Sequence, residues 1–180
     1  MIAKAIIAAA ILQGLATRAS AADDIDALGT KAFVEGCLIS QPSYEKMREL
    51  AGKWDWKLIG ESEDRHGSRR AEWQIASPGD SVVLFRLHSI IQPPQWDIFT
   101  CTVIFPNYRD RDKRIEKVFF EEIGHRPNAK VVIKLDIDGG KRLDYKDGPA
   151  LLTYFDGLLA DPHNTPWVFL AIQVDRLQKP

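Results

Sequence analysis

Hydrophobic residues near the start of the chain recur at the spacing of a helix. Five of them share one face: Ile25, Leu28, Ala32, Cys37 and Ile39. This pattern predicts a helix from about residue 23 to residue 40. A second, shorter helix is predicted from about residue 44 to residue 54, with Gly52 as the signal that ends it. Each helix has one apolar face, so each must pack against another element.

From residue 56 the period of the pattern changes toward two, which is typical of strands. Strands are predicted at 56–62, 69–77, 81–91 and 96–106. In the second of them, Ala71, Trp73 and Ile75 alternate with polar residues, so one face of the sheet is expected to be dry and the other wet. The turn-forming residues 77–80 predict that the second and third strands form a hairpin.

The second half of the chain predicts a helix from about 108 to 123, with Asn107 as its N-cap. Residues 130–146 read as a hairpin with a three-residue loop at 138–140, a register that sets Leu135 opposite Leu143 and Asp136 opposite Arg142. Residues 149–159 favour a short helix. A last strand at 167–176 is apolar on both faces, so it is expected to be central and covered on both sides.

These elements predict a single α+β domain. Its sheet is expected to be antiparallel or mixed, with about six to seven strands and with helices packed mainly on one face. The domain is expected to comprise residues 22–180, because the residues before it have the features of a targeting segment.

Residues 1–21 resemble a secretory signal peptide in their pattern. Lys4 stands near the start, an apolar stretch runs from residue 5 to residue 16, and the small residues 19–21 suit a cleavage site. The apolar stretch is shorter than the roughly 20 residues that a membrane-spanning helix needs. We therefore expect a periplasmic or secreted protein of a bacterial envelope, without a membrane anchor once residues 1–21 are removed.

Composition and charge narrow the classes of partner. Hydrophobic residues make up 45% of the chain and charged residues 27%, which is ordinary for a globular protein. Cleavage would remove Lys4 and Arg18 from the 24 basic residues and none of the 25 acidic ones, leaving a net charge of about −3. Such a domain is poorly suited to nucleic-acid phosphates. No polybasic segment is present for an anionic membrane.

The two cysteines, Cys37 and Cys101, are predicted to form a disulfide. Cys37 lies on the apolar stripe of the first helix, and Cys101 points to the drier face of the fourth strand. Pairing is the economical hypothesis for an exported chain with only two cysteines, against two separate buried thiols as the alternative. No Cys-x-x-Cys redox motif is present, so the disulfide is expected to be structural.

No catalytic, cofactor or metal motif stands out in the chain. The four histidines, at positions 66, 88, 125 and 163, lack the spacing of metal ligands, and the Asp136–Gly139 stretch departs from a calcium loop at Lys141. Phosphate-binding loops and nucleophile-elbow patterns are absent from the sequence. We therefore expect no cofactor, and catalysis is the less favoured hypothesis.

One strand face combines polar and aromatic residues. Arg86 and His88 share a side of the third predicted strand, and Trp96 and Ile98 share a side of the fourth with Thr100 and Thr102. If the two sides coincide, they form a mixed surface of the kind enriched at protein interfaces. The alternative is that the C-terminal segments cover this face.

The leading functional hypothesis is a non-catalytic envelope protein that binds another envelope or extracellular protein, as inhibitors, immunity proteins and assembly accessories do. Two alternatives stay open. One is a small exported hydrolase with His88 or His163 beside a carboxylate. The other is a small-ligand carrier with a tryptophan-lined pocket between helices and sheet.

Overall fold

The computed structural model describes residues 25–38, 43–75, 82–92, 96–137, 140–158 and 165–177. Residues 25–32 form an α-helix that continues into the π-helix η1 (Phe33–Cys37), and the other two helices are α2 (Tyr44–Lys53) and α3 (Arg114–Gly124). The strands are β1 (Lys57–Glu63), β2 (Arg69–Ile75), β3 (Val83–Gln92), β4 (Trp96–Pro106), β5 (Lys130–Ile137), β6 (Gly140–Asp147), β7 (Ala150–Leu158) and β8 (Pro166–Leu177).

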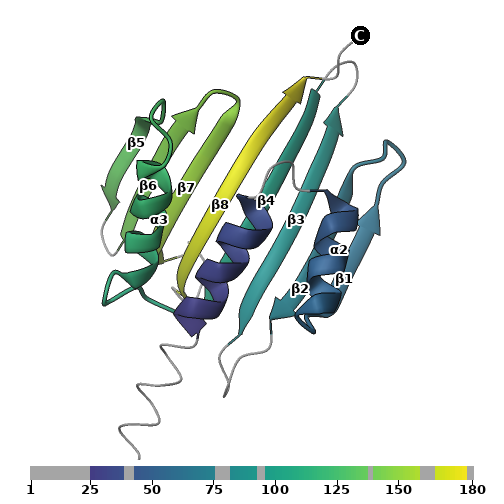
Figure 1. Ribbon diagram of the computed structural model, residues 1–180, viewed down its shortest axis with the longest axis horizontal. Coiled ribbons are helices and arrows are strands. Elements are labelled where there is room, and N and C mark those ends of the chain that lie inside the picture. The colour runs from purple at the N-terminus through teal and green to yellow at the C-terminus, as the bar shows by residue number, and fades with distance from the viewer. Residues whose placement is uncertain are drawn as a thin grey trace, which may run out of the picture.

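These strands form one antiparallel sheet in the order β1-β2-β3-β4-β8-β7-β6-β5. Strands β1 to β4 make one four-stranded meander and β5 to β8 make a second, and the two join where β4 pairs with β8. Figure 1 shows the helical segments on one side of the sheet, with the N-terminal helix in front of β4 and β8. We call this side of the sheet the covered face and the opposite side the open face.

The predicted architecture is wrong. In place of six to seven strands with helices packed mainly on one face, the described residues are mostly a single eight-stranded antiparallel sheet with three short helical segments. The predicted strands at 56–62, 69–77, 81–91 and 96–106 are confirmed within about two residues, as is the helix at 44–54. The strand count was too low because one strand was read as a helix.

That strand is β7, which lies where a helix was predicted at residues 149–159. Its residues Ala150, Leu152 and Tyr154 are buried on the covered face, while Leu151 and Phe155 lie half-buried on the open face. A segment that is apolar on both faces has no clear period, so its pattern does not distinguish strand from helix. The glycine at 148, with φ 56°, makes the tight turn from β6, because that left-handed backbone favours glycine.

The register of the β5-β6 hairpin also differs from the prediction by one residue. Leu135 lies opposite Arg142, and Lys134 opposite Leu143, because Ile137 pairs with Gly140. Two residues, 138 and 139, therefore connect the strands and lie outside the described residues. Their sequence, Asp-Gly, is a strong signal for a two-residue hairpin, and this signal outweighs the charge pairing that favoured the longer loop.

The third helix begins later than predicted, at Arg114, and Asn107 does not cap it. Asn107 has a φ of 57° and lies one residue after β4. The carboxylate of Asp110 instead accepts hydrogen bonds from the backbone amides of Ile115 (3.3 Å) and Glu116 (2.7 Å). The first turn of α3 is thus held by a buried acidic side chain from the preceding loop.

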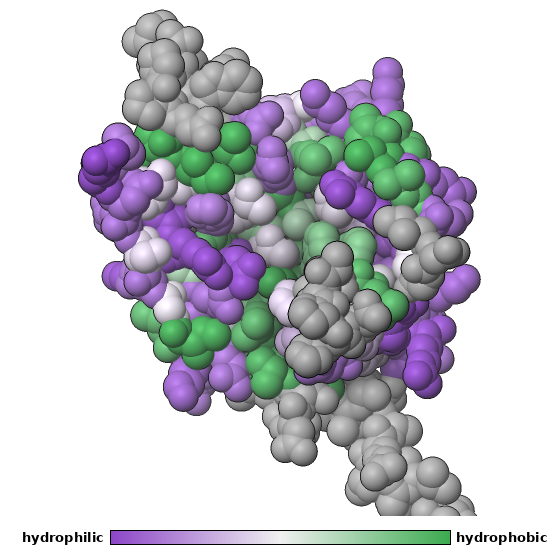
Figure 2. Space-filling model, turned by 180° about the vertical axis from the view of Figure 1, so that it is seen from behind, coloured by the Kyte–Doolittle hydropathy of each residue, from purple (hydrophilic) through white to green (hydrophobic). Residues whose placement is uncertain are grey.

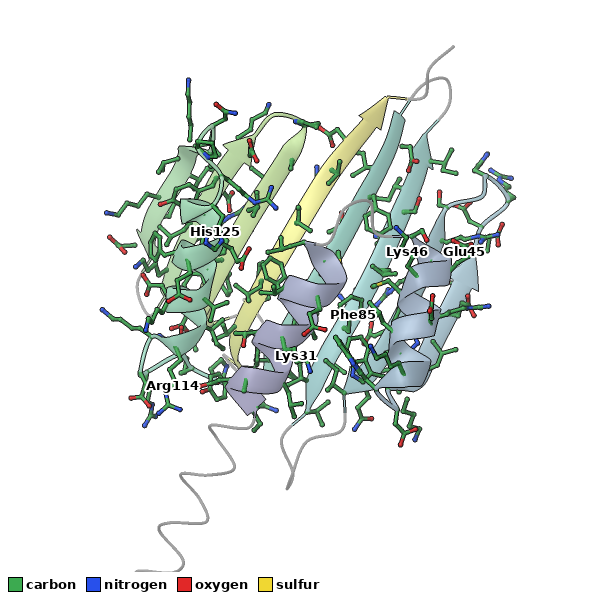
Figure 3. All side chains as sticks on the ribbon, in the orientation of Figure 1. Lys31, Glu45, Lys46, Phe85, Arg114 and His125 are labelled. Carbon is green, nitrogen blue, oxygen red and sulfur yellow. A yellow bond between two sulfur atoms is a disulfide. The ribbon has the colours of Figure 1, made fainter. Side chains whose placement is uncertain are left out.

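The core lies between the helices and the covered face. Phe85 is fully buried there, and Figure 3 shows it between the N-terminal helix and α2. Two glycines let the helix approach the sheet closely. A Cβ on Gly29 would lie 2.2 Å from the ring of Phe105, and one on Gly36 would lie 2.8 Å from Phe85. Side chains at these helix positions would displace the aromatic rings beneath them.

The predicted disulfide is confirmed. Cys37, in η1, is bonded to Cys101, in the middle of β4, with a Cα–Cα distance of 5.4 Å, and both residues are buried. The bond ties the end of the N-terminal helix to a central strand of the sheet. Among the described residues, no helix has both the length and the apolar character that crossing a membrane requires.

Candidate interaction surface

The two strand sides singled out in the sequence coincide on the open face. In the β3-β4 register, Arg86 lies opposite Thr102, His88 opposite Thr100, and Ile90 opposite Ile98. All six of these residues are half-buried, so the middle of the open face is partly accessible to solvent. The backbone of Trp96 pairs with Gln92 at the end of the same ladder, and its side chain lies outside what the structure describes.

The C-terminal strand does not cover this surface, because β8 pairs edge to edge with β4 and continues the same sheet. Its predicted central position is confirmed, but Trp167, Phe169 and Ala171 remain half-exposed on the open face. Figure 2 shows this side of the molecule, where apolar side chains (green) and polar ones (purple) are intermixed. The sheet therefore presents one continuous mixed surface across β2, β3, β4, β8 and β7.

An aromatic pair forms the part of this surface over β7 and β8. The rings of Phe155 and Phe169 stack with centroids 4.9 Å apart and an interplanar angle of 18°. Gly157 makes room for the pair, since a Cβ there would lie 2.7 Å from the ring of Phe155. Stacked, half-exposed aromatic rings supply apolar contact area at low cost in side-chain entropy, as anchors at interfaces do.

A charged network lies beside the ladder of β3. The carboxylate of Glu72 accepts hydrogen bonds from Arg86 Nε (2.8 Å) and from an Nη of Arg70 (3.2 Å). Burial alone would raise the pKa of Glu72, but the two guanidinium groups hold it below the ordinary value. Glu72 is thus ionised at neutral pH and fixes two arginines on the open face.

Another arginine on the open face, Arg142 of β6, is also held by a carboxylate of its own chain. Arg142 binds Asp144 through its Nε and an Nη at 2.8–3.1 Å, and the Asp144 side chain has no exposed surface whereas that of Arg142 is 41% exposed. The predicted register had set Asp136 opposite Arg142, but in the structure Asp136 lies opposite Lys141. A shared sequence spacing could have revealed both ion pairs, because Arg70 precedes Glu72 by two residues in β2 and Arg142 precedes Asp144 by two residues in β6.

His88 lies among cations rather than carboxylates. It is opposite Arg70 across the β2-β3 ladder and two residues from Arg86. Partial burial lowers its pKa, and the positive charges of Arg70 and Arg86 lower it further. His88 is therefore uncharged at neutral pH, and its described neighbours do not form the histidine–carboxylate pair that a hydrolase site would use.

The other histidines are not brought to this surface. His66 lies exposed in the β1-β2 turn, and His125 is exposed at the end of α3, where Figure 3 labels it. His163 falls outside the described residues. The structure therefore brings together Arg86, His88 and Ile98 of the candidate surface, but no pair of histidines among the three described.

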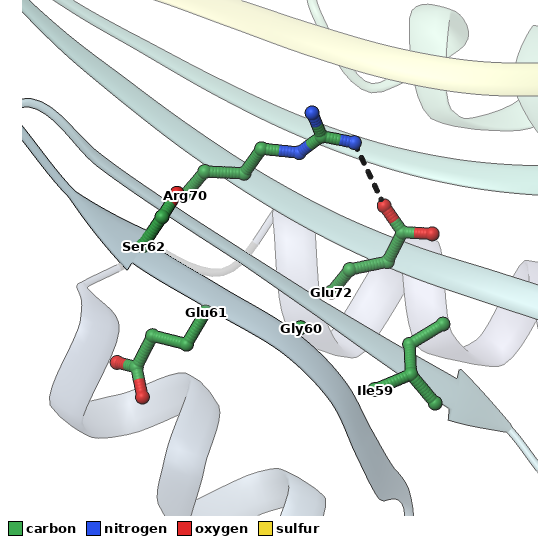
Figure 4. Close-up of a pocket in the computed structure, with 6 residues that line it drawn as sticks. All are labelled: Ile59, Gly60, Glu61, Ser62, Arg70 and Glu72. Carbon is green, nitrogen blue, oxygen red and sulfur yellow. Dashed lines mark hydrogen bonds and ion pairs between the residues drawn. The ribbon is translucent and has the colours of Figure 1, made fainter.

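A hollow of about 320 Å³ extends the open face toward the edge of the sheet. It is lined by residues of β1 and β2, which Figure 4 shows in close-up: Ile59, Gly60, Glu61, Ser62, Arg70 and Glu72. In that view the guanidinium of Arg70 reaches toward Glu72, while the side chain of Glu61 points to the other side, where it binds Arg48. The hollow thus places the guanidinium group of Arg70 and the apolar side chain of Ile59 on the same wall-lining surface.

Buried carboxylates gather at a different place, beneath the start of α3. Asp110 accepts a hydrogen bond from the hydroxyl of Tyr154 (3.0 Å) besides those from the helix amides, and Asp156 lies 2.9 Å from Arg109. Burial raises the pKa of Asp26 and of Asp156. Sequence reasoning missed this cluster because its members come from three segments that are distant in the sequence. No group of three possible metal ligands occurs within the described ranges.

Comparisons with known proteins complete the picture of the site. No family model, no curated protein and no solved structure matches the chain. The class defined by fold and surface is thus that of a disulfide-linked protein built on one eight-stranded antiparallel sheet with an open, mixed face.

Proposed function

We propose that this protein is exported to the periplasm or secreted, and that it acts without catalysis by binding another envelope or extracellular protein through its open sheet face. The observation that carries the proposal is the union of Arg86, His88, Thr100 and Ile98 on one accessible side of adjacent central strands. The disulfide supports the compartment, because such bonds persist in oxidising environments. The apolar segment with Lys4 before it supports export.

The chemistry of the face indicates what the partner presents. Arg70, Arg86 and Arg142 are held by carboxylates of their own chain yet keep guanidinium edges exposed, at 51%, 32% and 41%. Guanidinium groups beside apolar side chains are typical of interface hot spots, where they bind carboxylates and stack on aromatic rings. The partner should therefore offer acidic and aromatic side chains on one surface.

Affinity capture with a matched pair of variants tests the proposal. The bait is the oxidised chain from residue 22 to residue 180, incubated with envelope extract, with Arg86→Ala as the test variant and Arg48→Ala as the control. Both variants lose an ion pair at the surface, but Arg48 lies on α2 and pairs with Glu61 on the other side of the sheet.

The captured protein is then purified and its binding measured by calorimetry. We expect at least about a tenfold loss of affinity for Arg86→Ala and no change for Arg48→Ala, since truncating a fixed arginine at an interface centre commonly costs more than 1 kcal/mol. Equal affinities of both variants would place the binding elsewhere and reject the open face.

The carrier alternative has one observation in its favour. A groove of about 250 Å³ between the N-terminal helix, the end of α2 and the end of β2 is lined by Leu28, Lys31, Trp54, Trp56 and Ile75. The two indole rings lie 5.1 Å apart, and the ammonium of Lys31 lies 5.1 Å from the ring of Trp54. This groove suits an aromatic anion. Anilinonaphthalene sulfonate is a direct probe, and its fluorescence should rise with the protein and fall on Trp54→Leu if the carrier alternative holds.

A further inference from the structure

The exposed apolar side chains of this protein concentrate at the two edges of its sheet. Within the described residues, the large hydrophobic side chains that are exposed include Leu58 and Ile59 on β1, and Val131, Val132 and Leu135 on β5. Each edge strand also has a row of backbone N–H and C=O groups that no described strand pairs with. An edge with unpaired backbone and apolar side chains is a template for another strand.

The two edges differ in what they can pair with. In β1, Glu61 and Glu63 follow a bulge near Leu58 and Gly60. Every symmetrical antiparallel register centred on residues 61 to 63 sets glutamate opposite glutamate from a second copy, which is destabilising. The β1 edge therefore opposes self-pairing.

In β5 the charges alternate in sign, and one symmetrical register satisfies them. The bulge between Val131 and Ile133 ends the regular part of the strand, which leaves residues 133–137 for pairing. Centring on Lys134 or Asp136 would oppose like charges, and centring on Ile133 would reach into the bulge. Centring on Leu135 sets Lys134 of each copy opposite Asp136 of the other, with Leu135 opposite Leu135.

The faces of the strand agree with this register. Lys134 and Asp136 lie opposite Leu143 and Lys141 of β6, on the covered face, and both are exposed. Leu135, which is 47% exposed, lies on the open face. A two-fold axis perpendicular to the sheet keeps each face on its own side, so the charged residues of the two copies meet on one side and the leucines meet on the other.

We propose that two copies of this protein associate through antiparallel pairing of their β5 edges, with Leu135 at the two-fold axis. The product is a continuous sheet of two copies whose open faces lie on the same side. Association therefore places two copies of the Arg86 surface in one sheet, with strands β4, β8, β7, β6 and β5 of each copy between them, and a partner whose binding motifs are spaced to match can engage both at once.

A charge exchange tests both the association and its register. Sedimentation equilibrium should show a dimer of the oxidised protein, weakened at least about tenfold by Lys134→Asp and likewise by Asp136→Lys, because each change opposes like charges twice. The double variant Lys134→Asp/Asp136→Lys restores the two ion pairs in exchanged form, so its affinity should return to within about threefold of the original. Lys57→Asp on β1 serves as the control and should leave the dimer unchanged.

Crosslinking gives a second measurement that does not depend on affinity. With mild oxidant, Leu135→Cys should form an intermolecular disulfide in high yield, whereas Val131→Cys, which is at least as exposed, should not. A protein that stays monomeric up to its solubility limit overturns the proposal, as does a dimer indifferent to both charge changes. A double variant that fails to regain affinity while folded, as judged by circular dichroism, overturns the register.

Discussion

Removal of the Cys37–Cys101 disulfide should lower the free energy of unfolding by about 4 kcal/mol at 25 °C. The two cysteines are separated by 64 positions, and the loop that they close contains α2 and the first three strands. Crosslinking a loop of this length removes conformational entropy from the unfolded chain, and this entropy is the source of the stabilisation. The magnitude is a large fraction of the stability of an ordinary single domain.

The assay is urea unfolding followed by tryptophan fluorescence, for oxidised and reduced protein and for the variant Cys37→Ala/Cys101→Ala. Both sulfur atoms belong to buried residues, so the double alanine variant should lose about 1–2 kcal/mol more than the reduced protein, through lost packing. The slope of the free energy against urea should increase on reduction, because the unfolded chain becomes more extended.

A difference below about 1 kcal/mol between oxidised and reduced protein would refute the entropic reasoning. Titration of free thiols in the oxidised protein is the control. Two reactive thiols in unfolded, unreduced protein would contradict the disulfide itself.

Three further predictions follow from close contacts and buried charge. Gly29→Ala should lower the free energy of unfolding by about 1–3 kcal/mol in the same urea assay, because the new Cβ would overlap the ring of Phe105. Gly52→Ala is the control: a Cβ there would have nothing outside its own helix within 4 Å, so this variant should be as stable as the original protein or more stable. Tyr154→Phe should cost about 1–2 kcal/mol, because it leaves a buried oxygen of Asp110 without its hydroxyl donor; an unchanged urea midpoint would contradict this. The pKa of Glu72 is lowered in the folded state, so the ionised carboxylate stabilises the fold above the unfolded value of 4.5, and this contribution is lost as pH falls through the folded pKa. The free energies of unfolding of the original protein and of Glu72→Gln should therefore converge in acid. A difference between them that stays constant with pH would argue against the Glu72 network.

The parts of the fold that could be predicted from sequence are those with a clear period and an unequal pair of faces. Ala71, Trp73 and Ile75 alternate with polar residues, and the strand they predict is present. The same alternation placed Cys101 on the inner face and so predicted its bond to Cys37. Here one physical cause, the burial of one face, determines both the pattern and the structure.

The predictions that were wrong concern segments whose two faces do not differ in polarity, or whose pairing the pattern does not determine. The segment 150–158 is apolar on both faces, so burial gives it no period, and only its neighbours β6 and β8 define it as a strand. The β5-β6 register turned on a choice between loops of two and three residues, which differ by a one-residue slip. Both errors concern pairing, which depends on contacts between segments.

The candidate surface shows the same division. Which residues share a side of β3 or β4 follows from alternation, and Arg86 with His88 was found in that way. The polar sides of β3 and β4 face the same direction and are not covered by β8, but this depends on the order of the strands in the sheet. The alternation within a single strand does not reveal that order. The buried group around Asp110 and Tyr154 was missed for this reason too, since its members are 44 positions apart.

The position of β8 also has a consequence for how the chain assembles. Strand β8, the last described strand, is the inner partner of both β4 and β7, so the two meanders cannot close their common seam until β8 is available to pair with both. Cys37 and Cys101 both belong to the part made first, so their bond can form while that seam is still open. A chain that stops at residue 165, just before β8, would keep the Cys37–Cys101 bond and yet fall into two unjoined half-sheets.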